Sequence, residues 1–281
     1  MAQPEYAPEL ARLAVPGAGV LVRYGDHADQ FGELWPAAAA DTAGPRPVAV
    51  LVHGGFWRAR YRLDLMNALA AHLSATGVAV WNIEYRRADS GGGGWPGTFD
   101  DVAAAFGALP LLAAEHGLDL GRVAVIGHSA GGHLALWLAA DAARAARAGG
   151  TPAPPVGIGL VVGLAPVGDL VEAHRRGLAR DAAGRLLGAA YADAPERYLA
   201  ASPAALLPLG VPQLIVHGTA DEAVPYDMSV DFQAAARAAG DACELLSLPG
   251  TGHFELIDPG SAAWLRVTPY LSEVLGRPNP S

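Results

Sequence analysis

Three side chains along the chain could together activate a hydroxyl group for attack on a carbonyl carbon. Each lies in a glycine-rich segment: Ser129 in Gly-His-Ser-Ala-Gly, Asp221 in His-Gly-Thr-Ala-Asp and His253 in Gly-Thr-Gly-His-Phe. A serine hydroxyl is a weak nucleophile at neutral pH, so it needs an adjacent base that a carboxylate orients. The order Ser, Asp, His along the chain predicts a catalytic triad of these three residues.

The segments on either side of Ser129 support a catalytic serine more strongly than the Gly-x-Ser-x-Gly motif alone. Gly127 directly follows the apolar run 122–126, and a helix is expected from His133 to Ala146. A nucleophile elbow requires this strand–turn–helix setting, because the turn is too tight for side chains two positions either side of the serine. A glycine-rich helix start that only packs closely is the alternative interpretation.

The proposed acid and base also follow predicted strands. Asp221 comes just after the run Gln213–Val216, and His253 comes just after the last apolar run. The carboxyl ends of parallel strands open on one crevice, where such sheets bind ligands. Glu222 or Asp169 could supply the carboxylate instead. No other histidine follows Asp221 in the chain, which favours His253 as the base.

A fourth segment, His-Gly-Gly-Phe-Trp beginning at His53, follows the apolar run Val48–Val52. Acyl transfer builds negative charge on the carbonyl oxygen, and preorganised backbone N–H groups stabilise that charge. We expect the amides of Gly55 and Phe56, together with that of Ala130, to form this oxyanion hole. His53 fits a hydrogen bonder that braces the loop better than it fits a second base.

Several aromatic side chains are candidates for the walls of a substrate pocket. They are Phe56 and Trp57 in the loop, Trp95, and two tyrosines further on, Tyr191 and Tyr198. Such walls would favour a small apolar or aromatic substrate. Packing in the core is the alternative for each of them.

Short apolar runs alternate with segments of helical periodicity along most of the chain. Strands are expected at 20–24, 31–35, 48–52, 78–83, 122–126, 158–164, 213–216 and 244–248, the first two as an antiparallel hairpin. Helices are expected at 61–74, 99–116 with a kink near Pro110, 133–146, 226–239 and 262–275. This alternation predicts an α/β fold with a mainly parallel sheet that helices cover on both faces.

Two stretches fall outside the alternation. Residues 169–208 are far longer than a simple crossover needs, so we expect a short cap insertion with helical pieces at 170–178 and 182–191. The segment 90–97, with its run of four glycines, favours a flexible surface connection. We therefore expect a single domain over 1–281 that carries one insertion.

Composition excludes several classes of function. The 281 residues carry a formal charge of −9, and all 19 basic residues are arginine, so concentrated positive charge for nucleic acid or an anionic membrane is missing. The one cysteine, Cys243, can form neither an internal disulfide nor a multi-cysteine zinc site. Without a signal sequence or a long apolar run, a cytoplasmic protein is expected. The absence of lysine leaves His253 as the expected proton carrier.

These motifs resemble the α/β-hydrolase superfamily from Val20 to Leu275, and specifically its esterase-like branch with a Gly-x-Ser-Ala-Gly-Gly elbow. The form His-Gly-Gly-Phe-Trp is similar to that of the arylformamidase (kynurenine formamidase) group and of related small carboxylesterases. The resemblance implies that Ser129, Asp221 and His253 hydrolyse esters or an aryl formamide without a cofactor or metal.

The sequence thus predicts a serine hydrolase that cleaves an ester or aryl formamide bond of a small molecule through an acyl-enzyme. An exopeptidase related to prolyl oligopeptidase has the same elbow and triad order, and is the first alternative. A non-catalytic ligand-binding protein on the same fold is the second, because fold does not fix function. The sequence leaves the choice between a monomer and a homodimer open.

Overall fold

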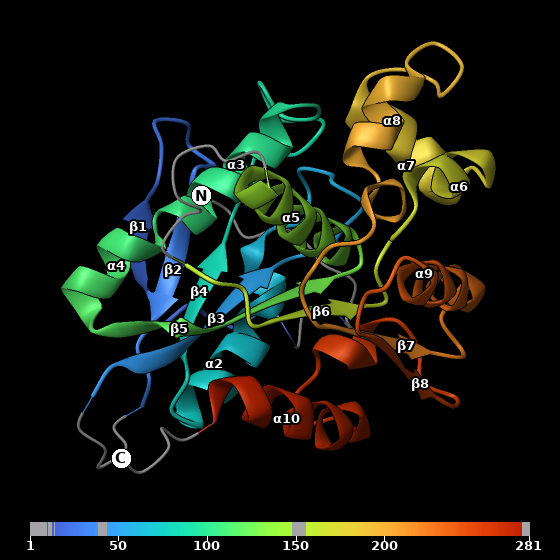
Figure 1. The fold of residues 1–281 in the computed structure, drawn as a ribbon. Coiled ribbons are helices and arrows are strands. Elements are labelled where there is room, and N and C mark those ends of the chain that lie inside the picture. Colours follow the sequence, from blue (N-terminus) through green and yellow to red (C-terminus); the bar gives the residue numbers. More distant parts are fainter. Residues whose placement is uncertain (1–9, 11–12, 14, 39–43, 148–155, 277–281) are drawn as a thin grey trace.

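The fold is built on one eight-stranded sheet with the order β1-β2-β4-β3-β5-β6-β7-β8 (Figure 1). The computed structural model describes residues 10, 13, 15–38, 44–147 and 156–276. The strands are Val20–Arg23 (β1), Phe31–Trp35 (β2), Arg46–Val52 (β3), Ala79–Ile83 (β4), Leu118–His128 (β5), Leu160–Leu164 (β6), Gln213–Gly218 (β7) and Cys243–Leu248 (β8). The pairs β1/β2 and β2/β4 are antiparallel and the others are parallel, which confirms the hairpin and the mainly parallel sheet.

Helices cover both faces of this sheet, as predicted. They are Leu63–Met66 (η1), Asn67–Ala75 (α2), Gly97–Gly107 (α3), Leu109–His116 (α4), Ala130–Arg147 (α5), Leu170–Arg175 (α6), Leu178–Leu187 (α7), Pro195–Ala201 (α8), Pro203–Leu206 (η2), Tyr226–Ala238 (α9), Phe254–Ile257 (η3) and Ala262–Leu275 (α10). In Figure 1, α2 and α10 lie below the sheet, whereas α3 and α5 lie above it.

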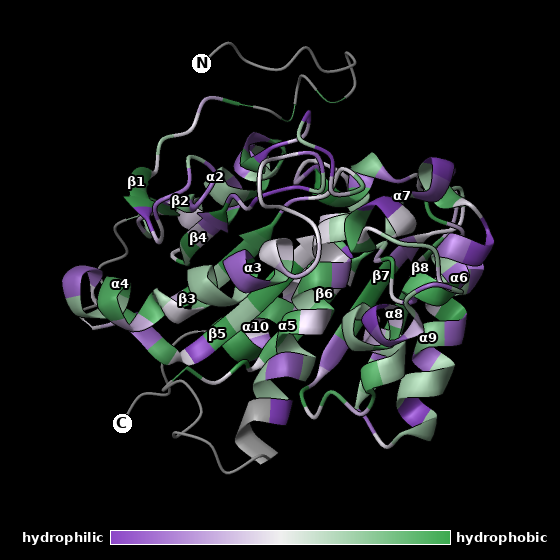
Figure 2. Ribbon diagram, turned by 90° about the horizontal axis from the view of Figure 1, so that it is seen from above, coloured by the Kyte–Doolittle hydropathy of each residue, from purple (hydrophilic) through white to green (hydrophobic). Residues whose placement is uncertain are grey.

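The core has two layers, one on each face of the sheet, and β3 contributes side chains to both. Val48, Val50 and Val52 belong to the cluster on the α5 side, whereas Ala49 and Leu51 belong to the cluster on the α10 side. Successive side chains of a strand point to opposite faces, so a strand covered on both sides must be apolar throughout. Figure 2 accordingly shows hydrophobic residues concentrated in the central strands and hydrophilic ones on outer helical turns.

The helix expected at 99–116 is two helices, α3 and α4, with Pro110 in the first turn of α4. Proline lacks an N–H group and is best accommodated in the first turn of a helix, so the predicted kink is a break between α3 and α4. The combined stretch Gly97–His116 is, within the described residues, long and apolar enough to span a membrane by composition, which we did not expect. Half of it is buried, and Ala105 O accepts a hydrogen bond from Trp81 Nε1 at 2.9 Å.

The segment with four glycines lies on the surface, as expected, with Gly91 and Gly92 exposed, but its second half is closely packed. A Cβ atom on Gly93 would lie 1.8 Å from Arg87 O, and one on Gly97 would lie 1.9 Å from Gly92 O. Trp95 N also donates to Leu186 O at 2.8 Å, which ties the segment to α7. Glycine is needed at positions 93 and 97 because the backbone approaches itself closely there.

The stretch 169–208 forms the helices α6, α7, α8 and η2, which lie together beside α9 in Figure 1. The helical pieces predicted at 170–178 and 182–191 correspond to α6 and α7, while α8 and η2 went unpredicted. Asp169 begins the segment as the N-cap of α6, and its Oδ1 accepts hydrogen bonds from the amides of Val171 and Glu172.

Candidate active site

Ser129 lies on a sharp turn between β5 and α5. Its backbone φ of +56° is in the left-handed region, and its amide donates to Leu164 O at 2.8 Å. A Cβ on Gly127 would lie 2.1 Å from Gly131 O, and a Cβ on Gly131 would lie 2.1 Å from Val52 O. Only glycine fits at both positions, so the motif has the physical role that the sequence suggested for a nucleophile elbow.

The structure brings Asp221 and His253 into direct contact, with 2.6 Å between His253 Nδ1 and Asp221 Oδ2. The other carboxylate oxygen accepts hydrogen bonds from the amides of Ala223 and Val224 at 2.8 and 2.9 Å. The alternatives lie elsewhere, since Asp169 caps α6 and Glu222 is exposed. Of the three carboxylates considered, Asp221 is the one placed to orient the imidazole.

His217, which the sequence interpretation overlooked, is a second histidine against the same carboxylate. Its Nε2 lies 3.2 Å from Asp221 Oδ2 and 3.0 Å from Val224 O, while its Nδ1 lies 2.7 Å from Ser229 Oγ. Burial would raise the pKa of Asp221, but hydrogen bonds from His217, His253 and the backbone hold that pKa well below its usual range. The carboxylate of Asp221 is therefore ionised at neutral pH.

Three buried polar atoms near the elbow have no hydrogen-bond partner within the described residues: Ser129 Oγ, Trp57 Nε1 and His133 Nδ1. The Trp57 and His133 rings are in edge contact, with centroids 5.1 Å apart. The hydroxyl of Ser129 is thus not bonded to His253 in this structure. Hydrogen bonds between a nucleophile and its base are often loose without substrate and tighten when it binds.

The loop expected to hold the oxyanion lies directly against the elbow. A Cβ on Gly54 would lie 3.0 Å from Ser129 Cβ. The next three residues all have positive φ, namely Gly55 at +112°, Phe56 at +50° and Trp57 at +55°. Such backbone is strained for large side chains and is typical of functional sites. Ala130 opens α5, where the first amides of a helix have no acceptor within the helix.

A buried ion-pair network braces this loop. His53 Nε2 lies 2.8 Å from Glu84 Oε1, and its Nδ1 lies 2.8 Å from Gly54 O. Glu84 also pairs with Arg87 and accepts a hydrogen bond from the amide of Leu63. Burial opposes the charge on Glu84, but His53 and Arg87 hold its pKa below the ordinary value. Both nitrogens of His53 are engaged, which supports the bracing role.

Of the five aromatic residues predicted to line the pocket, the four other than Phe56 are spread over several places. Trp57 is 1% exposed and packs on His133. Trp95 lines a cavity of about 590 Å³ between α3, α5 and the segment 200–206. Tyr198 is fully buried, with its hydroxyl donating to Ala189 O, and Tyr191 packs on its ring. Tyr198 is therefore a core residue of the insertion, and it lines neither this cavity nor the one described next.

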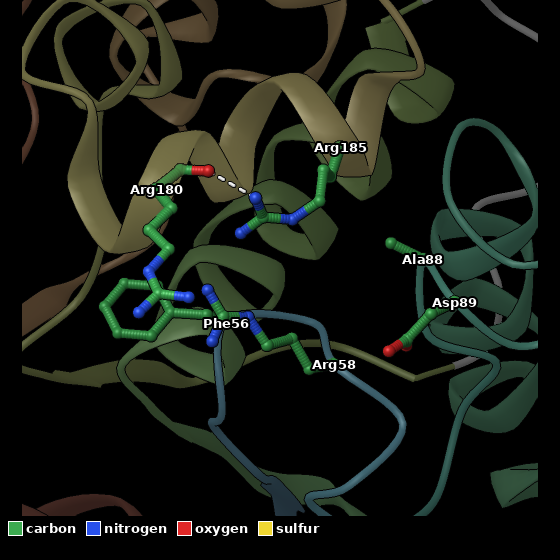
Figure 3. Close-up of a pocket in the computed structure, with 6 residues that line it drawn as sticks. All are labelled: Phe56, Arg58, Ala88, Asp89, Arg180 and Arg185. Carbon is green, nitrogen blue, oxygen red and sulfur yellow. Dashed lines mark hydrogen bonds between the residues drawn. The ribbon is translucent and has the colours of Figure 1, made fainter.

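A second cavity, of about 390 Å³, borders the loop at Phe56 (Figure 3). Its other lining residues are Arg58, Ala88, Asp89, Arg180 and Arg185. Figure 3 shows guanidinium groups reaching into it both from α7 and from the loop after β3. Sequence reasoning missed all three arginines. Within the described residues, no group of three or more His, Cys, Asp or Glu side chains could hold a metal ion.

Comparison with known proteins identifies related sequences and folds. The model of a family described as BD-FAE matches residues 37–236, more than half of the chain. Esterase LipC of Mycobacterium tuberculosis is 30% identical over 244 residues, which are 84% of this chain and 60% of that protein. Carboxylesterase NlhH of the same species is 36% identical over 106 residues, which are 37% of this chain and 31% of that protein.

Several solved structures with the same fold are described as esterases. A truncated carbohydrate esterase from gut microbiota superposes with a TM-score of 0.76 at 20% identity, covering 92% of this chain and 95% of that one. An inhibited esterase B from Lactobacillus rhamnosis gives a TM-score of 0.76 at 22% identity, covering 94% and 92%. These likenesses confirm the α/β-hydrolase fold that the motifs predicted.

Proposed function

Because the chain belongs to the BD-FAE family, we propose that it is a serine hydrolase that cleaves carboxylic esters of small molecules through an acyl-enzyme. The observation that carries the proposal is the 2.6 Å contact between Asp221 and His253, together with the strained elbow that holds Ser129. The esterases named above support the ester as the bond cleaved, although the chain spans only 60% of the length of LipC.

The first half of the reaction forms the acyl-enzyme. His253 Nε2 takes the proton of Ser129 as Oγ bonds to the substrate carbonyl carbon, and Asp221 keeps the imidazole in the tautomer with a proton on Nδ1. The amides of Gly55, Phe56 and Ala130 donate to the negative oxygen of the tetrahedral intermediate. When this intermediate collapses, the bond to the alcohol breaks, and His253 gives its proton to the departing oxygen.

The second half releases the acid. A water molecule gives a proton to His253 as its oxygen bonds to the acyl carbon, and the new tetrahedral intermediate uses the same three amides. Its collapse breaks the bond to Ser129 Oγ, which recovers the proton from His253. One ester and one water become one acid and one alcohol.

The direct test is Ser129→Ala with 4-nitrophenyl butyrate as substrate. We expect kcat to fall at least about a thousandfold, because removing a nucleophile abolishes the acyl-enzyme route. A fluorophosphonate probe should label the wild-type protein once and leave Ser129→Ala unlabelled. The matched control is Ser272→Ala, since Ser272 is an exposed residue of α10 whose hydroxyl, among the described residues, donates only to Thr268 O. Wild-type turnover by Ser129→Ala would disprove the proposal.

An aryl formamide is the second candidate substrate, and the His-Gly-Gly-Phe-Trp loop is the observation that favours it. A panel of N-formylkynurenine, phenyl acetate, short 4-nitrophenyl esters and aminoacyl anilides separates the classes. A higher kcat/KM for the formamide would assign the arylformamidase reaction, and preference for the anilides would assign an exopeptidase. We expect the esters to be preferred.

A further inference from the structure

The cavity beside Phe56 concentrates positive charge in a protein that is acidic overall. Three of its six lining residues are arginines, Arg58, Arg180 and Arg185, whereas the whole chain carries a formal charge of −9. A cleft lined by charges of one sign raises the local concentration of ligands that carry the opposite charge. The one acidic side chain lining the cavity, Asp89, accepts a hydrogen bond from the amide of Ala59.

None of the three guanidinium groups forms an ion pair with a carboxylate of the described residues. Arg58 and Arg185 both donate to Ala179 O, and Arg185 also donates to Arg180 O. The side chain of Arg180 makes no hydrogen bond among the described residues and is exposed. Burial, and then the neighbouring charge of Arg185, lower the pKa of Arg58. Three positive charges thus line this cavity beside a single carboxylate, Asp89, which leaves the cavity with an excess of positive charge.

This cavity adjoins the loop that packs against the nucleophile elbow. Phe56 belongs both to the cavity wall and to the loop that packs on the elbow, where a Cβ on Gly54 would lie 3.0 Å from Ser129 Cβ. Gly54 and Phe56 are two residues apart, so their Cα atoms are separated by at most roughly 7.6 Å. A substrate with its carbonyl at Ser129 can therefore extend past Phe56 into the cavity over a few bonds.

We propose that this cavity binds a carboxylate of the substrate, so that the enzyme prefers esters with a negatively charged group a few bonds from the scissile carbonyl. This inference rests on the proposed ester hydrolysis and adds the substrate class. Arginine suits the role because its planar fork of donors matches a carboxylate in a bidentate geometry. Arg180 is the main ligand, since its donors have no other partner among the described residues, and Arg58 and Arg185 add charge from opposite walls (Figure 3).

A purely structural role is the competing explanation for two of the arginines. Ala179, Arg180 and Asp181 all have positive φ, from +49° to +59°, and the hydrogen bonds of Arg58 and Arg185 hold this left-handed turn. Replacing either would disturb the turn as well as the charge. Arg180→Gln is the clean variant, because it removes a charge without removing a hydrogen bond to the turn.

Two pairs of esters, matched in size, test the proposal and tell which side of the ester enters the cavity. The first pair is 4-nitrophenyl hydrogen succinate and 4-nitrophenyl butyrate, which have four-carbon acyl groups with and without a carboxylate. The second pair is 4-acetoxybenzoate and its methyl ester, which differ by a carboxylate on the leaving group. The measured quantity in each pair is the ratio of kcat/KM for the anionic ester over the neutral one.

For at least one pair, Arg180→Gln should lower this ratio about tenfold, mainly through KM, and Arg180→Lys should restore part of it. Arg266→Gln, which removes an exposed arginine of α10, should leave the ratio unchanged. Hydrolysis of the neutral esters with the ratio unchanged by Arg180→Gln in both pairs would overturn the carboxylate site and leave the proposed function intact. If no ester is cleaved and the fluorophosphonate labels nothing, the proposed function itself fails.

Discussion

Lowering the pH should destabilise this protein at pH values well above those at which carboxylates become protonated. The reason is the buried side chain of His133. This residue lies in α5, one turn after Ser129, and is completely buried. Its Nε2 donates to Ala201 O at 2.8 Å, while Nδ1 has no partner among the described residues. Burial lowers its pKa to about 4, since a second proton would place a charge in the core with no acceptor to receive it.

The size of the effect follows from the difference between the folded and unfolded states. A histidine in the unfolded chain has a pKa of about 6.5, so between pH 6.5 and 4 the unfolded state binds a proton that the folded state does not. The free energy of unfolding therefore falls as the pH falls through this window. The full difference is about 3.4 kcal/mol, and the part lost between pH 7 and pH 5 is about 2 kcal/mol.

Urea denaturation at pH 7 and pH 5, followed by tryptophan fluorescence, measures this loss. We expect His133→Gln to lose about 2 kcal/mol less than the wild type between the two pH values. Part of the loss should remain, because burial also lowers the pKa of His128 well below its ordinary value. The matched control, His116→Gln at an exposed position of α4, should lose as much as the wild type. An equal loss in His133→Gln and the wild type would refute the reasoning.

Three further substitutions test the geometry of the site. Gly131→Ala places a Cβ 2.1 Å from Val52 O, so urea denaturation should show a loss of about 1–3 kcal/mol in the free energy of unfolding. The control Gly107→Ala, whose Cβ meets no atom within 4 Å, should cost nothing, and equal effects of the two substitutions would contradict the packing argument. Asp221→Asn should lower kcat for 4-nitrophenyl butyrate about 10⁴-fold with a similar KM, and a fall of less than tenfold would remove Asp221 from the triad. Glu84→Gln breaks the buried ion pair with Arg87 and should cost about 3–5 kcal/mol of stability in thermal or urea unfolding. An unchanged unfolding midpoint would show that Glu84 does not brace the loop.

The features predicted correctly are those with a local signal. Continuous apolar runs mark strands that are buried on both faces, and the helix at 262–275 has the predicted bounds because its apolar residues repeat at helical spacing. The elbow and the segments that carry Asp221 and His253 were found because glycine at a fixed spacing has a steric reason to be there. The contact between Asp221 and His253 follows from where two parallel strands end.

The missed features depend on contacts between distant parts of the chain. Helix α5 starts at Ala130, although Gly131 and Gly132 have low helix propensity. Tertiary packing requires glycine at both positions, because Gly131 lies against Val52 at the end of β3 and Gly132 lies against Pro166. No sequence pattern joins Arg58 to Arg180, because they are 122 positions apart. The direction of the Arg180 side chain depends on a left-handed turn of non-glycine residues. His217 was visible four positions before Asp221, but a histidine beside a strand end is equally typical of core packing.

Backbone strain in this protein is concentrated around the proposed site. Among the described residues, six of the seven non-glycine residues with positive φ lie in the oxyanion loop, the elbow or the turn that begins α7; Ala165, after β6, is the seventh. Each such residue costs of order 1–3 kcal/mol, so the surrounding contacts must hold it in place. Arg58 supplies one of these contacts between two strained segments, because it follows Phe56 and Trp57 in the loop and donates to Ala179 O. The loop with Phe56 and Trp57 and the turn 179–181 are therefore held at a fixed distance from each other. In the proposed complex, this would fix the separation between the carbonyl and the carboxylate of one substrate.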